Sequence, residues 1–411
     1  MGPVSQQYEA YPYPARDPAE EATRLIVGSP GHPFEIDHFL HGGARDWSRP
    51  FRVLVAGGGT GDGLIMLAQV LADHGAEAEI IYLDISRASR RIAEARAAAR
   101  GLTNIRFETG DMLRAVEYGV FDYIDCCGVL PHLPDPDAGF AALRAALAEG
   151  GGIGGTVHAP YGRAGVYEMR DALRALKADD PPEAQVARTL SLMNALPPTN
   201  GLARNPFLQA HAQGGDAGLY DLLLHEWDRP YDVEALFDAL DRADLAFVSF
   251  PAPGRYDPCL MIADPELRAR AAALPERARA ALAERLVGNI KSHAFYATAK
   301  GDAPRIAMPA PDAVPVLIGV SGAALAESIY KAGMIRFESD GTAVQRALPR
   351  DAAGILSAMD GRRSLDEIRR AIGWQPTQFD DMFGKLYQFM NNFGLIRFSR
   401  LKRLASRHPA G

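Results

Sequence analysis

Cysteine is scarce in this chain of 411 residues, which contains only Cys126, Cys127 and Cys259. Two of the three are adjacent, so neither a disulfide framework nor a zinc site with paired CxxC ligands fits the sequence. The chain also lacks the run of about 18 uninterrupted apolar residues that a membrane helix requires. Its first residues, MGPVSQQYEAYPYPARDP, have neither the basic nor the apolar region of a signal peptide. We therefore expect a cytoplasmic protein with no membrane partner.

Basic residues are in the minority over most of the chain. Residues 336–411 hold 13 Lys and Arg against 8 Asp and Glu, whereas residues 1–335 hold 31 against 43. An acidic body repels the phosphate backbone, so nucleic acid is not an expected partner. The basic C-terminal segment is consistent with an anionic partner or with a solvated helix face.

The composition, with 47% hydrophobic and 23% charged residues, is typical of globular proteins, and the length allows two or three domains. From residue 51 onward, short apolar runs alternate with long helical stretches, which predicts a doubly wound α/β domain with a parallel sheet. Strands are expected at 51–56, 79–84, 105–108, 123–127 and 153–159, with helices at 61–74, 86–100 and 138–148.

Four segments follow from this pattern. Residues 1–44, rich in proline and aromatics, form an N-terminal arm, and residues 45–300 form the α/β domain, with a helical insert at 160–240. After the insert we expect a strand at 246–250, a long helix at 266–286 and a strand at 293–299. Residues 301–333 contain the proline-rich stretch DAPRIAMPAPDAVP and are expected to be a linker. Residues 334–411 form a small C-terminal domain.

Two phosphate-binding motifs are absent from the stretch VLVAGGGTGDG at residues 53–63. The dinucleotide pattern GxGxxG fails in both registers, because Asp62 and Leu64 occupy the positions of its last glycine. The pattern GxxxxGK[ST] is absent as well. A strand that runs into glycines and then into a helix still favours a nucleotide-like cofactor, because the backbone can approach the ligand closely.

The pattern that does fit is GxGxG at Gly57, Gly59 and Gly61. Asp84 ends the second expected strand, where a carboxylate can accept both hydroxyls of a ribose. Asp111 follows the third, where an acceptor can meet an adenine amino group. Each acid alone could equally be a helix N-cap. Together, in this order, the three features indicate a crevice for an adenosine without phosphates.

These residues resemble the class I S-adenosylmethionine-dependent methyltransferases. VLVAGGGTG, YLDIS, TGDML and FDYIDCCGVLPHLPDP match the family's successive motifs, the last being the most specific. The match covers about residues 45–160 well and extends loosely to 300. The resemblance implies a Rossmann-like sheet of seven strands, with the last pair antiparallel, and S-adenosylmethionine as the cofactor.

The resemblance also implies roles for individual residues. The three glycines would line the methionine part, Asp84 with Ile85 the ribose and Asp111 with Met112 the adenine, and Cys127 would lie beside the cofactor; the set is Gly57, Gly59, Gly61, Asp84, Ile85, Asp111, Met112 and Cys127. Two positions depart from the family pattern. Val55 replaces an acid, and Pro131 replaces the first of two histidines. Asp62 is a candidate to compensate by facing the cofactor's charged groups, or it is simply an acid in the first turn of a helix.

Methyl transfer requires alignment of acceptor, methyl group and sulfur, and an acceptor that loses a proton needs a base. His132 is our candidate base, and a loop histidine without a chemical role is the alternative. Candidate residues on the acceptor side are Tyr11 and Tyr13 in the arm, Tyr161 after the fifth strand, and His225 in the insert. We expect the arm and the insert to cover the acceptor.

Two other groups of residues have types that can carry chemistry. His38 and His41 have the spacing HxxH, but no acid or cysteine follows at ligand spacing, so no metal is expected. The adjacent cysteines have no paired base in the sequence and are expected to be buried packing.

The C-terminal segment loosely resembles a small winged-helix unit such as the pyrroloquinoline-quinone peptide chaperone. Members of that group bind a peptide along a strand edge. Three interpretations remain open: docking of a substrate peptide, dimerisation or structural support, which we favour, and nucleic-acid binding.

The sequence thus predicts a methyltransferase whose acceptor is a small metabolite or a peptide or protein side chain, with a homodimer as a further option. The alternatives are a catalytically silent scaffold that binds the cofactor or a partner, and an NAD-dependent oxidoreductase. One fold hosts many methylation chemistries, so the acceptor atom is not predicted.

Overall fold

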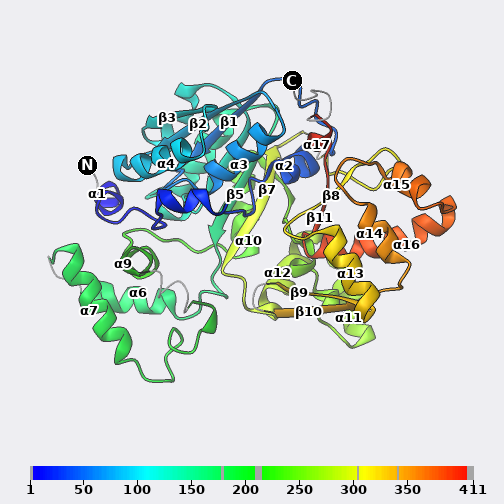
Figure 1. The fold of residues 1–411 in the computed structure, drawn as a ribbon. Helices are drawn as coiled ribbons and strands as arrows, with labels where there is room; N and C mark the ends of the chain where they lie inside the picture. Colours follow the sequence, from blue (N-terminus) through cyan, green and yellow to red (C-terminus); the bar gives the residue numbers. More distant parts are fainter. Residues whose placement is uncertain (1–2, 177–179, 209–214, 303–304, 340–341, 405–411) are drawn as a thin grey trace.

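The computed structural model describes residues 3–176, 180–208, 215–302, 305–339 and 342–404. Its centre is a seven-stranded sheet in the order β3-β2-β1-β4-β5-β7-β6 (Figure 1). β7 is antiparallel to both neighbours, and the other adjacent pairs are parallel. The strands are β1 (Phe51–Ala56), β2 (Ala78–Asp84), β3 (Ile105–Thr109), β4 (Phe121–Cys127), β5 (Leu147–His158), β6 (Leu245–Ser249) and β7 (Ser292–Ala299). The predicted α/β fold with seven strands is confirmed.

Helices cover both faces of this sheet because the buried strands place apolar side chains alternately on each face. Leu54, Ile124 and Ile153 pack with one set of helices, whereas Val53 and Val55 pack with the other. The first set is α5 (Pro136–Ala145), α10 (Val233–Arg242) and α12 (Glu276–Val287), and the second is α2 (Pro33–Leu40), α3 (Asp62–Asp73) and α4 (Arg87–Ala99).

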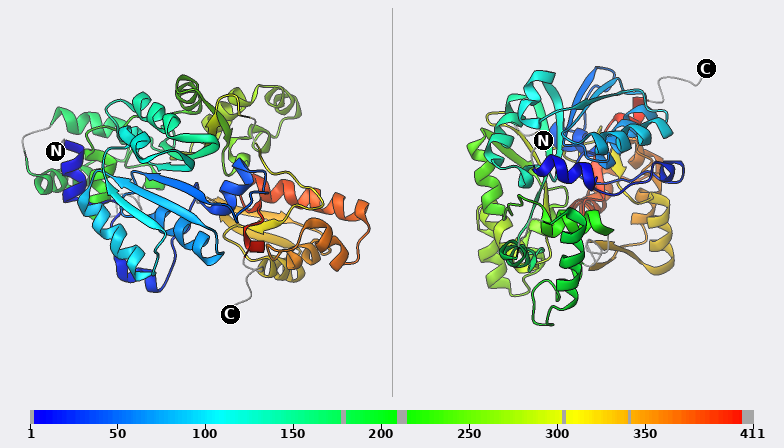
Figure 2. Two further views of the ribbon diagram at one scale, coloured as in Figure 1. Left: turned by 90° about the horizontal axis from the view of Figure 1, so that it is seen from above. Right: turned by 90° about the vertical axis from the view of Figure 1, so that its left-hand side faces the viewer.

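Two segments after β5 differ from expectation in detail. The single helix expected at 266–286 is two helices, α11 (Pro265–Ala272) and α12, and Pro275 is the N-cap of the second. The insert contains α6 (Val166–Ala175), α7 (Pro182–Asn194), α9 (Gly215–Leu219) and the π-helical turn η5 (Tyr220–Leu224). These elements share their own apolar cluster and form a lobe beside the sheet (Figures 1 and 2).

The C-terminal part begins earlier than expected. The segment 301–333, expected as a linker, contains β8 (Pro315–Leu317) and α13 (Gly322–Ala332). β8 pairs with β11 (Ile396–Phe398), and β9 (Met334–Ser339) forms a hairpin with β10 (Thr342–Ala347). The remaining helices are α14 (Ala352–Ala358), α15 (Leu365–Ala371), α16 (Pro376–Asn392) and α17 (Leu401–Leu404). Apolar side chains of this segment form a separate core.

Buried polar contacts join the C-terminal part to α2. Arg397 in β11 pairs with Glu35 at 2.8 Å, and both side chains are at most 2% exposed. Asp37 accepts hydrogen bonds from Ser399 Oγ at 2.7 Å and Trp47 Nε1 at 3.0 Å. His38 Nδ1 accepts a bond from the amide of Phe398. The first two turns of α2 therefore depend on residues more than 350 positions away.

None of the described helices combines the length and apolar character that crossing a membrane requires.

We predict that Arg397→Met lowers the free energy of unfolding by about 3–5 kcal/mol, because it leaves the Glu35 carboxylate buried without its counter-ion. Urea unfolding of the full chain measures this. Arg400→Met is the matched control, since Arg400 pairs with Asp312 at the surface and its loss should cost less than about 1 kcal/mol. Equal effects of the two substitutions would contradict the prediction.

Candidate functional site

A cavity of about 720 Å³ lies at the carboxyl ends of the parallel strands. In an open α/β sheet this is where ligands bind, at the point where the strand order reverses. Residues at the ends of β1, β2, β4 and β5 and in the turn after β3 form its floor, the N-terminal arm closes one side, and residues from the insert close another. Of the predicted residues, those that line it are Tyr13, Gly57, Gly59, Asp62, Asp84, Ile85, Asp111, Met112, Cys127 and His132.

The turn after β1 requires glycine at two positions. Gly57 and Gly59 have φ values of +71° and +52°, in the left-handed region. A Cβ on Gly57 would lie 2.3 Å from Val129 Cγ2. Gly61 also has a positive φ, but it packs against Ala93 of α4 and is not among the residues that line the cavity.

Asp84 is buried at the end of β2 and holds the glycine turn in place. Its Oδ2 accepts a hydrogen bond from the amide of Gly59 and its Oδ1 one from the amide of Ser86, both at 2.8 Å. Burial raises the pKa of Asp84, and these two amides counteract that effect. The carboxylate thus fixes the turn and still lines the cavity.

Asp111 and Cys127 line other parts of the cavity wall. Asp111 Oδ1 accepts a hydrogen bond from the amide of Leu113, and the residue is the N-cap of the short helix η2 (Met112–Tyr118). Cys127 ends β4, is exposed and lines the cavity, so the expectation that both cysteines are buried is wrong for Cys127 and holds for Cys126 alone. Desolvation by the cavity wall and the nearby Asp125 carboxylate raise the pKa of the Cys127 thiol, so the sulfur is a neutral donor and a poor nucleophile.

The arm lies across the glycine turn. Tyr8, from α1 (Pro3–Ala10), lines the cavity together with Tyr13. Thr60 Oγ1 donates a hydrogen bond to the carbonyl oxygen of Pro14 at 2.7 Å. Glu9 accepts hydrogen bonds from Ser86 Oγ and from backbone amides at the start of α4. The arm therefore contacts the glycine turn and the start of α4, on the side of the cavity predicted for the cofactor. Its role in covering the acceptor stays a prediction.

Two arginines form ion pairs with the carboxylate of Asp62. Arg16 of the arm donates two hydrogen bonds to its carboxylate, at 2.8 and 2.6 Å, and Arg96 of α4 donates one at 2.7 Å. Although burial opposes ionisation, these arginines hold the pKa of Asp62 below its ordinary value. The carboxylate lines the cavity, but its charge is already balanced inside the protein.

His132 lies in the turn η3 (Leu130–His132), which follows β4. Asp84 ends β2, and β1 lies between these two strands. The Nδ1 of His132 is 2.7 Å from the carbonyl oxygen of Trp227. A carbonyl only accepts, so Nδ1 carries a hydrogen, and in the neutral ring Nε2 has the free lone pair. Asp221 Oδ1 lies 3.8 Å from that Nε2 and also lines the cavity.

His158, at the end of β5, is a second imidazole in the cavity wall. Its Nδ1 donates to Asp228 Oδ1 at 2.8 Å, and Arg163 donates to the other oxygen at 2.9 Å. Burial would raise the pKa of Asp228, but His158 and Arg163 hold it well below its ordinary value. Burial lowers the pKa of His158 to about 4, so the ring is neutral near pH 7.

Three predicted acceptor-side residues lie outside the cavity lining. Tyr11 stacks on Tyr220 within the insert cluster. Tyr161 is at the surface, where Arg285 donates to its hydroxyl. His225 lies against His132 with ring centroids 3.9 Å apart and the rings tilted by 31°, and it lines a second cavity of about 730 Å³, formed by α1, α6, α7 and η5. Burial lowers the pKa of His225 to about 3.

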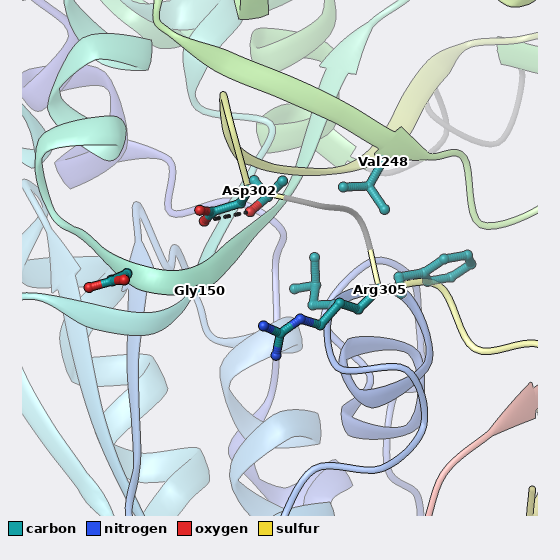
Figure 3. Close-up of a pocket in the computed structure, with 8 residues that line it drawn as sticks. Gly150, Val248, Asp302 and Arg305 are labelled. Carbon is teal, nitrogen blue, oxygen red and sulfur yellow. Dashed lines mark hydrogen bonds between the residues drawn. The ribbon is translucent and has the colours of Figure 1, made fainter.

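A third cavity is far from these residues. It holds about 110 Å³, too little for a nucleoside, and lies near the start of β5 and the end of β7, beside Gly150 and Val248 (Figure 3). Asp302 and Arg305 lie on two sides of it, and Asp302 is bonded to Thr298. His38 and His41, the HxxH pair, are in α2 and at its C-cap, and among the described residues no group of three metal-ligating side chains was found.

Sequence reasoning missed several polar residues of the main cavity. They are Asp125, His158, Asp221 and Tyr8, all in the cavity wall. Asp125 stands between apolar residues in the middle of β4, and an acid at that place was the one signal available. The other three come from distant segments, and nothing in their local sequence shows that they meet at His132.

Comparison with known proteins agrees with this geometry. A family profile described as a methyltransferase domain matches residues 54–153, which extend from within β1 through the glycine turn and β4 into β5. The uncharacterized protein syc1184_c of Synechococcus sp. is 31% identical over 299 residues, 71% of this chain and 70% of its own length. The chain contains a domain of the S-adenosylmethionine-dependent methyltransferase family.

Solved structures show the same fold as this methyltransferase. PKMT2 from Rickettsia typhi superposes with a TM-score of 0.59 at 13% identity, over 97% of this chain and 77% of that one. PKMT2 in complex with AdoHcy superposes with a TM-score of 0.57 at 13% identity, over 95% and 76%. At this identity the likeness concerns the fold, and it extends over the C-terminal part as well as the sheet.

We predict that Gly57→Ala destabilises the methyltransferase by about 1–3 kcal/mol more than Gly75→Ala. Both glycines have φ +71°, so both variants incur about 1–2 kcal/mol of backbone strain. A Cβ on Gly57 would also clash with Val129, whereas no atom lies within 4 Å of a Cβ on Gly75. Chemical unfolding of the two variants measures the difference, and equal losses would show that Val129 simply moves aside.

Proposed function

We propose that the protein transfers the methyl group of S-adenosylmethionine to an acceptor bound near His132. The observation that carries this proposal is one cavity with an adenosine-sized crevice at Asp84 and Asp111 and a cluster of imidazoles at its other end. The acceptor is a small metabolite or a peptide or protein side chain that passes beneath the arm and the insert.

The residues present fit the cofactor. A cavity of about 720 Å³ is within the range of small-molecule sites. The backbone at Gly57 and Gly59 approaches the cavity where a side chain would obstruct it. Gly57 and Gly59 would hold the methionine part, Asp84 with Ile85 the ribose, and Asp111 with Met112 the adenine. When bound, S-adenosylmethionine supplies an electrophilic methyl group on a sulfonium.

His132 is the proposed base. Its hydrogen bond to the carbonyl oxygen of Trp227 keeps Nε2 unprotonated in the neutral ring. That nitrogen takes the proton that the acceptor loses as its bond to the methyl group forms. Asp221, 3.8 Å from Nε2, stabilises the imidazolium that results. The residues of the arm and the insert that line the cavity, among them Tyr8 and Trp227, limit the access of water.

Asp84→Ala tests the cofactor site. It removes the ribose acceptor and the group that holds the amides of Gly59 and Ser86, so we expect cofactor affinity to fall by about 100-fold or more. Calorimetric titration with S-adenosylhomocysteine measures this. The control is Asp73→Ala, because Asp73 is bonded to Gln69 at the surface of α3. An unchanged affinity in Asp84→Ala would mean that the ribose is bound elsewhere.

The transfer itself is measured with labelled S-adenosylmethionine and cell extract, followed by separation into small molecules, protein and RNA. We expect label in small molecules or protein. Cofactor binding without any labelled product would favour a silent scaffold, and binding of NADH in place of S-adenosylhomocysteine would favour an oxidoreductase.

His132→Ala tests the base. We expect kcat to fall by about 10²–10⁴-fold while the Kd for S-adenosylhomocysteine stays the same, because His132 acts on the acceptor. His158→Ala, measured in parallel, removes the other imidazole of the cavity, which Asp228 holds in place. A large loss in His158→Ala with near-normal turnover in His132→Ala would assign the base to His158.

A further inference from the structure

Asp125 in β4 lies directly beside the position where this chain departs from its family. The family's acid before the glycine turn is Val55 here, and Val55 is the register partner of Asp125 in the parallel pair of β1 and β4. Side chains at paired positions of parallel strands point to the same face, about 4.8 Å apart. Both residues line the main cavity. The carboxylate missing from β1 is therefore present one strand away.

The Asp125 carboxylate is buried without a counter-ion. Its side chain is 5% exposed, and among the described residues it takes part in no ion pair. Its hydrogen-bond donors are neutral: Tyr123 Oη, 3.3 Å from Oδ2, and the Cys127 thiol. Burial raises the pKa of Asp125 to about 7. A buried carboxylate without a counter-ion is stabilised when a cation enters the cavity beside it.

The other acids of the cavity are already engaged. Asp62 has Arg16 and Arg96, Asp84 accepts two backbone amides, and Asp221 lies beside His132. Asp111 accepts the amide of Leu113. Asp125 is thus a buried acid of this cavity for which the described residues provide neither a cationic side chain nor a backbone amide.

The two oxygens of Asp125 face different surroundings. Oδ2 faces Tyr123 and the loop at Gly31, where a Cβ would lie 2.5 Å from it. Oδ1 faces the start of α3, 3.6 Å from the Cβ position of Gly63. Gly63 and Asp125 line the same cavity, so Oδ1 is the oxygen available to a ligand.

We propose that Asp125 binds the α-ammonium of the cofactor's methionine part, in place of the acid that the family carries at the position of Val55. The inference rests on the proposed function, because it requires S-adenosylmethionine to occupy the cavity. The glycine turn that would hold the methionine part follows Val55 by two residues, and the ribose acid Asp84 is on the other side of β1. The cofactor's ammonium is the cation whose position this arrangement matches.

The test compares two ligands that share an adenosine. S-adenosylhomocysteine carries the α-ammonium, whereas 5′-deoxy-5′-methylthioadenosine lacks the whole amino-acid part. Asp125→Asn keeps the shape and removes the charge. We expect its affinity for S-adenosylhomocysteine to fall about 10- to 100-fold, with its affinity for methylthioadenosine unchanged. Asp84→Asn is the matched control, which should weaken both ligands together.

Each outcome has a distinct meaning. Equal losses for both ligands in Asp125→Asn, or no loss for either, would overturn the inference. Normal affinity for S-adenosylhomocysteine with a raised KM for an amine acceptor would overturn it as well and assign Asp125 to the acceptor. If the unaltered protein binds neither ligand, the proposed function itself fails.

A second variant covers the case in which Asp125→Asn does not fold. Val55→Asp combined with Asp125→Val moves the carboxylate back to β1 at the same level of the sheet. Tight binding of S-adenosylhomocysteine by this double variant, with Asp125→Val alone binding weakly, supports the inference. Tight binding by Asp125→Val alone overturns it.

Discussion

The buried ion pair between Glu35 and Arg397 is the contact on which the arrangement of the whole chain depends. Glu35 Oε2 also accepts hydrogen bonds from Ser29 Oγ and from Tyr296 Oη. Tyr296 lies in β7, and its hydroxyl oxygen accepts the amide of Gly31 at 3.1 Å. One carboxylate therefore ties the C-terminal part, the central sheet and the loop before α2 together. Because Gly31 packs against Asp125, this network ends at the floor of the cavity.

A second buried network of ion pairs links the N-terminal arm to the α/β domain. Arg96 of α4 pairs with Glu21 at 2.6 Å and with Asp62 at 2.7 Å, and its side chain is 1% exposed. Arg16 adds a second arginine to Asp62. These pairs stabilise the arm against α3 and α4 at the edge of the glycine turn. The N-terminal arm thus contacts the cavity through the pair of Arg16 with Asp62, and the C-terminal part is linked to it through the pair of Arg397 with Glu35. Both segments therefore support the site.

The local features of the fold were predictable from the sequence, and the long-range ones were not. The strand that becomes β1 was predicted at its observed bounds, and Asp84 was predicted at the end of β2, because apolar runs and glycine turns are local signals. The structured part of 301–333 was missed because proline-rich sequence resembles a linker until β8 pairs with β11, almost 80 residues later. Likewise, the sequence contains Asp125 in the strand that becomes β4, but it does not show that Asp125 lies beside Val55, since strand register is set by tertiary packing.

The charges around the cavity suit a cofactor that changes its own charge in the reaction. S-adenosylmethionine carries one net positive charge, and the product that remains after transfer is neutral. Burial lowers the pKa of His158 to about 4 and that of His225 to about 3, so these two imidazoles are neutral near pH 7. Asp125 therefore faces the cavity without a competing positive charge from these rings. Attraction between such a carboxylate and the bound cofactor is strong in a site of low dielectric constant, and loss of the sulfonium charge weakens it. In the proposed reaction the same electrostatics that favour binding of the methyl donor thus favour release of its product.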